Sequence, residues 1–113
     1  MSIQIFGTKK CFDTKKAQRF FKERRVKFQF IDLKEKEMSK GEFLSVVKSC
    51  GINDLINDKA KDYKKSNLDK IRSAETKMEI VFKNQLLLKT PIVRSGPKAA
   101  AGFDEDKWTK LIE

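Results

Sequence analysis

The opening of the chain constrains the fold most, because its hydrophobic pattern changes period twice within residues 1–33. Residues 2–6 form a short β-type run, which Gly7 and the polar residues after it interrupt. A helical pattern runs from Phe12 to about Arg25, and residues 27–33 return to strand-like alternation. A helix of this length permits the crossover that joins two parallel strands. We therefore predict that the chain opens with a strand, a helix and a second, parallel strand.

The middle of the chain predicts helices. Ser39 and Glu42 match a capping box that begins a helix, and Gly51 ends it. Residues 53–67 are polar and predict short helical turns and loop. Residues 68–83 carry apolar side chains at helical spacing and predict one or two helices.

The last part of the chain predicts a β-hairpin and a final helix. Residues 91–94 and 98–101 can form antiparallel strands around a turn at residues 95–97. Asp104 then caps a helix that places Trp108 inward. The predicted fold class is α/β, with a mixed four-stranded sheet built from βαβ and ββα halves and additional helices between the halves. This element order is that of a thioredoxin-like fold.

Length and hydropathy bound the organisation and the location of the protein. A chain of 113 residues fits a single domain, which we expect to span residues 1–113. No apolar stretch approaches the ~20 residues that cross a bilayer, and the amino terminus lacks the features of a signal peptide. We expect a cytoplasmic monomer without a membrane partner.

The net charge of +10 raises the alternative of a polyanionic partner, since clustered lysines gain affinity by displacing counterions from phosphates. The lysines are instead spread along the whole chain, with acidic residues between them. The densest basic groups also lack the aromatic interleaving of a single-strand binding platform. We therefore expect no specific nucleic-acid binding and interpret the charge as a lysine-rich solvated surface.

The chain has two cysteines, Cys11 and Cys50, and no histidine. This composition excludes histidine-based nucleophile activation, and two cysteines alone cannot build a closed zinc site of the usual kind, so we expect no metal. A structural disulfide is not expected in a reducing compartment. Cys50 lies on the apolar stripe of the helix that ends at Gly51, where a cysteine usually packs as a small hydrophobe.

Cys11 is the candidate nucleophile, because it lies where the first strand hands over to the first helix. A free thiol has a pKa of ~8.5 and is mostly protonated in the cytosol, whereas the thiolate is the reactive form. Unpaired N–H groups and the helix dipole favour an anionic sulfur at this end of a helix. Thr14 can donate its hydroxyl to the sulfur, and Lys10 contributes positive charge, while Asp13 opposes both. The alternative is an inert cysteine, partly buried in a loop.

Five short segments of the chain together match a pattern known from other proteins. They read IFGTKKC at residues 5–11, KAQRFF at 16–21, FIDL at 30–33, LLLKTPIV at 86–93 and GFDEDKW at 102–108. Together they resemble the arsenate-reductase-like (ArsC/Spx) branch of the thioredoxin superfamily over nearly the full length. The resemblance implies a thioredoxin-like fold in which Pro91 faces Cys11 and follows a cis peptide bond. Without the resemblance, Thr90 and Pro91 would mark only the start of a strand.

The resemblance also implies residues that contact the substrate. Family arsenate reductases attack an oxyanion with this cysteine, pass the electrons to glutathione through a mixed disulfide, and hold the anion with arginines. This chain has Thr90 at the arginine position before the proline, and Lys59 is the only basic residue near the middle-loop arginine position. Arg94 and Lys98 can supply charge from the following strands. Lysine lacks the bidentate grip of a guanidinium, which speaks against arsenate itself as the substrate.

Three hypotheses follow. The first is a thiol-dependent oxidoreductase in which Cys11 is the nucleophile, Thr14 stabilises its thiolate, and Pro91 shapes the groove for glutathione or a glutaredoxin. This enzyme needs no bound cofactor, and glutathione is its co-substrate. The second is a regulator of the Spx type that binds the RNA polymerase α subunit; such regulators often carry Cys-x-x-Cys, and Thr14 here replaces the second cysteine. The third is a scaffold that keeps the fold and has lost the chemistry.

Overall fold

A four-stranded mixed sheet organises the chain in the computed structural model, which describes residues 2–113. The strands are β1 (Ile3–Gly7), β2 (Phe28–Asp32), β3 (Ile92–Ser95) and β4 (Lys98–Ala101), in the order β2-β1-β3-β4. β2 pairs with β1 in parallel, whereas β3 is antiparallel to both β1 and β4. The predicted α/β class, parallel opening and closing hairpin are confirmed.

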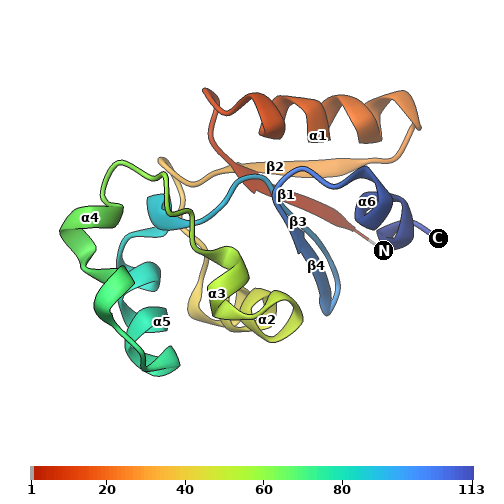
Figure 1. Cartoon of the computed structure of the whole chain (residues 1–113). Helices are drawn as coiled ribbons and strands as arrows, with labels where there is room; N and C mark the ends of the chain where they lie inside the picture. The colour runs from red at the N-terminus through yellow and green to blue at the C-terminus, as the bar shows by residue number, and fades with distance from the viewer. Residues whose placement is uncertain (1) are drawn as a thin grey trace.

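Helices cover both faces of the sheet (Figure 1). They are α1 (Phe12–Glu23), α2 (Lys40–Cys50), α3 (Ile52–Leu55), α4 (Tyr63–Ser66), α5 (Ala74–Lys83) and α6 (Glu105–Leu111), with 3-10 turns η1 (Leu68–Lys70) and η2 (Gln85–Leu87). α1 and α6 pack on one face, while α2, α3 and α5 pack on the other. In the part of the chain that the structure describes, no helix is long and apolar enough to cross a membrane.

The face under α1 and α6 is closed by aromatic side chains. Successive strand residues point to opposite faces, so Ile5 faces this side and its neighbour Phe6 faces the other. Phe20 and Phe21 from α1 meet Trp108 from α6, and the Phe20 and Trp108 ring centroids are 5.3 Å apart. Trp108 is fully buried, as its predicted inward position requires. This packing fixes α1 against β1 and therefore fixes the start of α1.

The opposite face contains a buried glutamine that the sequence analysis did not anticipate. The side chain of Gln85 accepts a hydrogen bond from the Met38 N–H at 2.6 Å and donates to the carbonyls of Met38 and Phe82 at 3.1 and 3.3 Å. It therefore joins the end of α5 to the segment before α2. The turn η2 that presents Gln85 was also absent from the predicted elements.

Local signals in the sequence set the ends of two helices. Ser39 and Glu42 form the predicted capping box at the start of α2, and Gly51 ends it with a φ of 84°. α1 ends at Glu23, two residues before the predicted end, because Arg25 adopts a left-handed conformation with a φ of 58°. The chain then turns into β2, and the Val26 N–H closes the turn by donating to a carbonyl within α1.

Candidate active site

The loop between β1 and α1 places Cys11 at the amino end of a 12-residue helix. Cys11 is the N-cap residue, with extended backbone angles (φ −79°, ψ 117°). Its N–H donates to the Thr8 carbonyl and its own carbonyl accepts from the Lys15 N–H, both at 3.2 Å. The first turn of a helix leaves N–H groups without intrahelical partners. The thiol therefore lies beside a partial positive charge.

Thr90 meets Cys11 from the other end of the chain. The carboxyl end of β1 and the amino end of the antiparallel strand β3 lie side by side, so the residues before β3 reach the loop after β1. The Thr90 hydroxyl donates to the Cys11 sulfur at 3.1 Å, and the thiol can donate in return to the Thr90 carbonyl at 3.6 Å. The Thr90–Pro91 peptide bond is cis, as the resemblance implied, and Pro91 is buried.

Thr14 is buried against the end of β1. Its side chain is fully buried (0% exposed), and its hydroxyl has no aligned hydrogen-bond partner among residues 2–113. Space for it exists only because residue 7 is glycine: a methyl group at Gly7 would collide with the Thr14 hydroxyl and methyl groups. An unpaired buried hydroxyl costs roughly 1–3 kcal/mol, so its position one helical turn after Cys11 needs an explanation. A negatively charged sulfur at Cys11 provides a partner for it.

The surroundings of Cys11 stabilise the thiolate. Burial raises the pKa of the Cys11 thiol. Once the thiol is ionised, the hydroxyls of Thr14 and Thr90 and the backbone N–H groups of Thr14 and Asp13 can donate to the sulfur, and these interactions outweigh burial and lower the pKa below its ordinary value. Lys10, which the sequence analysis assigned to thiolate stabilisation, is exposed and does not contribute to this shift. Hydrogen bonds, rather than lysine charge, favour the thiolate.

Arg94 does not reach the thiol. It pairs with Gln4 in the sheet, three positions before the end of β1, and its Nη1 donates to the Gln4 side chain at 2.7 Å. Its charge helps to lower the pKa of Glu42 on α2. Arg94 alternates with Val93 along β3 and therefore faces α2 instead of α1. The alternation of side chains along a strand was present in the sequence. It could not show which face Arg94 occupies until the register of β3 against β1 was known.

Lys59 lies in the exposed segment between α3 and α4. Its backbone N–H donates to the side chain of Asn57 at 3.0 Å, and the structure records no contact between Lys59 and the thiol. Residues 55–57 are held to residues 87–89 by backbone hydrogen bonds and an isolated β-bridge. Because residues 87–89 lead directly into Thr90, the segment that carries Lys59 is tied to the strand that forms the site.

Cys50 lies in a different environment. Its thiol donates to the Ala99 carbonyl at 3.5 Å, at the carboxyl end of α2, and it is half-buried against the core on the α2 side. Burial raises the pKa of the Cys50 thiol, opposed by the charge of Lys107 and by Ser49. Both cysteines are free thiols. The two differ in the direction of their pKa shifts, which allows them to be told apart by titration.

The sequence analysis assigned no role to two exposed aromatic residues, one of which directly follows Cys11. Phe12, directly after Cys11, is 75% exposed, and the ammonium of Lys15 lies 5.5 Å from its ring centroid. Phe103 is 48% exposed, with the ammonium of Lys16 at 5.2 Å from its ring. For Phe12, the available signal in the sequence was an aromatic residue directly after a cysteine, in an otherwise polar helical turn.

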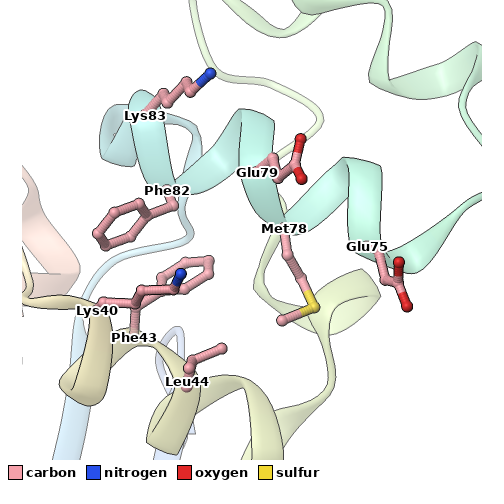
Figure 2. Close-up of a pocket in the computed structure, with 8 residues that line it drawn as sticks. All are labelled: Lys40, Phe43, Leu44, Glu75, Met78, Glu79, Phe82 and Lys83. Atoms are coloured by element: carbon pink, nitrogen blue, oxygen red, sulfur yellow. The ribbon is translucent and has the colours of Figure 1, made fainter.

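A groove of about 380 Å³ lies elsewhere, between α2 and α5. Figure 2 shows that Met78 and Leu44 lie beside this groove and that the rings of Phe43 and Phe82 face each other within it, with centroids 5.3 Å apart. Cys11 does not line it. In residues 2–113, no cluster of three or more cysteine and carboxylate side chains could hold a metal ion.

Comparison with known proteins gives one family. The model described as ArsC family matches residues 6–111. The uncharacterized protein YusI of Bacillus subtilis is 26% identical over 113 residues, covering 96% of each chain. The global transcriptional regulator Spx of Streptococcus pyogenes is 25% identical over 108 residues, covering 93% of this chain and 81% of Spx.

A solved structure extends the comparison to the fold. An arsenate reductase from Vibrio cholerae superimposes with a TM-score of 0.86 at 20% identity and covers 98% of each chain. At this identity the likeness establishes the fold alone. The thioredoxin-like fold predicted from the element order is confirmed.

Proposed function

This chain belongs to the ArsC family, and on that premise we propose that it is a thiol-dependent oxidoreductase with Cys11 as its single nucleophile. One observation carries the proposal: Cys11 is the N-cap residue of α1, and the Thr90 hydroxyl donates to its sulfur at 3.1 Å. Thr14 and Thr90 supply hydrogen bonds that favour the thiolate, which is the attacking form of cysteine. Pro91 is buried next to Thr90, and its proposed role is to shape the surface at which a thiol partner meets the sulfur.

The proposed reaction passes through a mixed disulfide with glutathione or a glutaredoxin. The Cys11 thiolate attacks the glutathione sulfur of a glutathionylated substrate, forms a new S–S bond, and releases the substrate thiolate. A second thiolate then attacks the same glutathione sulfur, forms a disulfide with it, and releases the Cys11 thiolate. The electron pair comes from the second thiol, and no bound cofactor takes part. Thr14 stands where a second cysteine could resolve the bond, so the resolving thiol is external.

The surroundings of Cys11 favour a disulfide substrate over a tetrahedral oxyanion. An oxyanion is held best by planar guanidinium groups. Arg94 faces α2, and the structure records no arginine contact to Cys11 among residues 2–113. We propose that Lys59, in the segment between α3 and α4, is the basic residue that can approach the Cys11 sulfur. This arrangement supports thiol–disulfide exchange ahead of arsenate reduction.

The test is the alkylation rate of each cysteine between about pH 4 and 10, read by peptide mass spectrometry, with glutathione disulfide as a second probe. We expect Cys11 to titrate below the ~8.5 of a free thiol and to take up one glutathionyl group, while Cys50 titrates above ~8.5 and stays unmodified. The Cys11→Ser variant identifies the signal from Cys50. A Cys11 that reacts no faster at neutral pH than a free thiol would overturn the proposal.

The likeness to Spx favours a second candidate, a regulator that binds the RNA polymerase α subunit. Its test is binding to the isolated carboxyl-terminal domain of that subunit, measured with wild type and the Cys11→Ser variant. Binding that does not depend on Cys11, together with an unreactive thiol, would replace the enzyme proposal. Absence of binding would remove this second candidate.

A further inference from the structure

The groove between α2 and α5 exposes apolar side chains on the face of the sheet opposite α1. Its volume of about 380 Å³ lies within the range of ligand-binding clefts. Phe43 is buried in it, Phe82 and Met78 are half-buried, and Leu44 is 43% exposed beside them. Apolar surface with a polar rim is typical of an interaction site.

The charged residues at the rim of this groove are separated by sign. Lys40 begins α2 and Lys83 ends α5, and both lie at the end of the groove where the two phenylalanine rings meet (Figure 2). Glu75 and Glu79 lie towards the other end, beside the methionine. All four are exposed, and within residues 2–113 none of them forms an ion pair. One end of the groove is therefore positive and the other is negative.

Two of these placements are unfavourable for the protein by itself. Lys40 puts a cation at the amino end of α2, where the helix dipole is also positive. Glu75 and Glu79 are four residues apart on α5, so two like charges are neighbours on the helix surface. An anion beside Lys40 and a cation beside the two glutamates would offset both effects. The rim thus complements a molecule that carries both signs of charge, separated along its length.

The shape of the groove and the order of the charges favour a helix as the occupant. An amphipathic helix is convex and can lay its apolar stripe into a groove of this kind. Acidic residues in the first turn and basic residues in the last are also the order that the dipole of such a helix favours. α5 has 10 residues and spans ~15 Å, so about three turns of a partner helix match it.

Two other occupants fit less well. A second copy of the chain, related by a two-fold axis, would bring an identical hollow against this one, and the net charge of +10 on each copy opposes their approach. A small carboxylate with an apolar tail would use only the lysine end and would leave the two glutamates without a partner.

We propose that the groove between α2 and α5 binds an amphipathic helix of another protein, with an acidic first turn and a basic last turn. The helix lies antiparallel to α5. Its acidic turn contacts the two lysines, its apolar stripe covers Leu44 and Met78, and its basic turn contacts the two glutamates. This interaction does not involve Cys11, so it goes beyond the proposed function, and either can fail without the other.

The probe is the capped peptide Ser-Glu-Glu-Leu-Glu-Ala-Leu-Leu-Ala-Lys-Leu-Lys-Lys-Ala, which has equal numbers of acidic and basic residues and a leucine stripe at helical spacing. Calorimetric titration of the full chain measures its affinity, and backbone amide chemical shifts of the isotope-labelled protein locate its site. We expect saturable binding of one peptide per chain. The shifts should change in α2 and α5 and stay unchanged at Cys11 and Thr14.

Three variants test the parts of the surface. Leu44→Asp puts a carboxylate into the apolar contact and should weaken binding by about tenfold or more. Lys40→Gln combined with Lys83→Gln should weaken it by about threefold, and so should Glu75→Gln combined with Glu79→Gln. The two double variants change the net charge of the chain in opposite directions. A loss of affinity in both therefore cannot come from net charge.

Leu86→Asp is the matched control, because Leu86 is 45% exposed and does not line the groove. It should leave binding unchanged, and thermal unfolding should show that Leu44→Asp and Leu86→Asp are both folded. Absence of peptide binding to wild type, or equal affinity of wild type and Leu44→Asp, would overturn the proposal.

The other occupants have their own outcomes. Self-association of the wild type that Leu44→Asp abolishes, measured by sedimentation velocity, would assign the groove to a second copy and overturn the partner helix. Binding of dodecanoate without binding of the peptide would assign it to a small carboxylate instead.

Discussion

At the scale of single residues, the lowered pKa of Cys11 depends on hydrogen-bond donors more than on nearby charge. The sequence places four lysines within five residues of the thiol, which suggests stabilisation by charge. In the structure, the pKa of Cys11 is lowered by hydrogen bonds from Thr14, Thr90 and nearby backbone N–H groups, against the effect of burial. A hydrogen bond to a charged group is worth about 1.5–3 kcal/mol, which can outweigh a solvated lysine.

The Thr14→Val variant separates reactivity from stability. Valine has nearly the same shape but no hydroxyl, so the pKa of Cys11 should rise and its alkylation rate near pH 7 should fall by about tenfold, the effect of ~1.4 kcal/mol. At a pH low enough to keep Cys11 protonated, the free energy of unfolding should not decrease, because the Thr14 hydroxyl has no aligned partner in that state. The pH profile of alkylation and denaturant unfolding measure the two quantities.

Thr109→Val is the control for this prediction, since the Thr109 hydroxyl donates to the Glu105 carbonyl on the exposed side of α6. The control should leave the Cys11 profile unchanged. An unchanged profile in Thr14→Val would show that Thr14 does not act on the thiol.

The sequence predicted the position of the proposed nucleophile better than it predicted the surroundings of that residue. The position of Cys11 follows from a strand end and a helix start, both of which are local signals. Pro91 entered only through the family resemblance, because its approach to Cys11 depends on the pairing of β3 with β1. The orientation of Arg94 depends on the same pairing, and the exposure of Phe12 depends on which face of α1 meets the sheet. Long-range register decided all three.

At the scale of elements, α2 illustrates how a local motif couples to the sheet. Its capping box joins Ser39 and Glu42, with the Ser39 N–H donating to Glu42 at 2.9 Å and the Glu42 N–H donating to Ser39 at 3.2 Å. Burial raises the pKa of Glu42, while Ser39, the charge of Arg94 and Gln4 lower it to a net value below the ordinary one. The cap is therefore also an electrostatic contact between α2 and β3.

The Ser39→Ala variant should lower the free energy of unfolding by about 1 kcal/mol at pH 7. A depressed carboxyl pKa contributes stability that is present above the unfolded value of ~4.3 and is lost as the pH falls through the folded value. The difference between wild type and Ser39→Ala should therefore shrink as the pH falls from about 5 towards 3. Urea unfolding at several pH values measures it.

Ser73→Ala provides the comparison, because Ser73 caps α5 through the Thr76 N–H without a carboxylate at the third helical position. At pH 7, Ser73→Ala should lower the free energy of unfolding by about as much as Ser39→Ala does. This loss should change little as the pH falls. Parallel pH dependences of the two variants would contradict the role assigned to Glu42.

Periodicity and capping residues were sufficient to predict most elements, since these signals lie within a few residues of one another. The turn η2 was missed for the opposite reason. Gln85 is held by the backbone of Met38, 47 positions earlier, and a polar residue gives no sign in the sequence that it will be buried. Elements that depend on one distant hydrogen-bonded partner escape local pattern analysis.

At the scale of the whole molecule, two separate cores lie on the two faces of one sheet. The central strands β1 and β3 contribute to both cores and also bring Cys11 and Thr90 together. The net charge of +10 acts at this scale, because it attracts anionic reagents before any contact forms. Charge can therefore set the rate of encounter even though hydrogen bonds set the pKa of the thiol.

Ionic strength tests this division. The Debye length falls from ~30 Å at 0.01 M to ~8 Å at 0.15 M salt, so the attraction of a distant anion weakens. The rate of Cys11 with anionic 5,5′-dithiobis(2-nitrobenzoate) should fall severalfold over this range, whereas the rate with neutral 2,2′-dithiodipyridine should change little. Stopped-flow absorbance measures both. Equal salt dependence for the two reagents would exclude electrostatic steering.

The contact between Gly7 and Thr14 has a consequence for how variants of this protein would be interpreted. Residue 7 has no side chain, lies at the end of a strand and is buried, so an inventory of chemical groups would pass over it. Yet even one added carbon there would push the first turn of α1 away from β1 and carry the nucleophile with it. In a survey of substitutions, replacements of Gly7 should affect Cys11 as strongly as replacements of the residues that contact its sulfur. Replacements of exposed residues around the site should have less effect. The most restrictive position in the site is thus defined by an atom that must be missing.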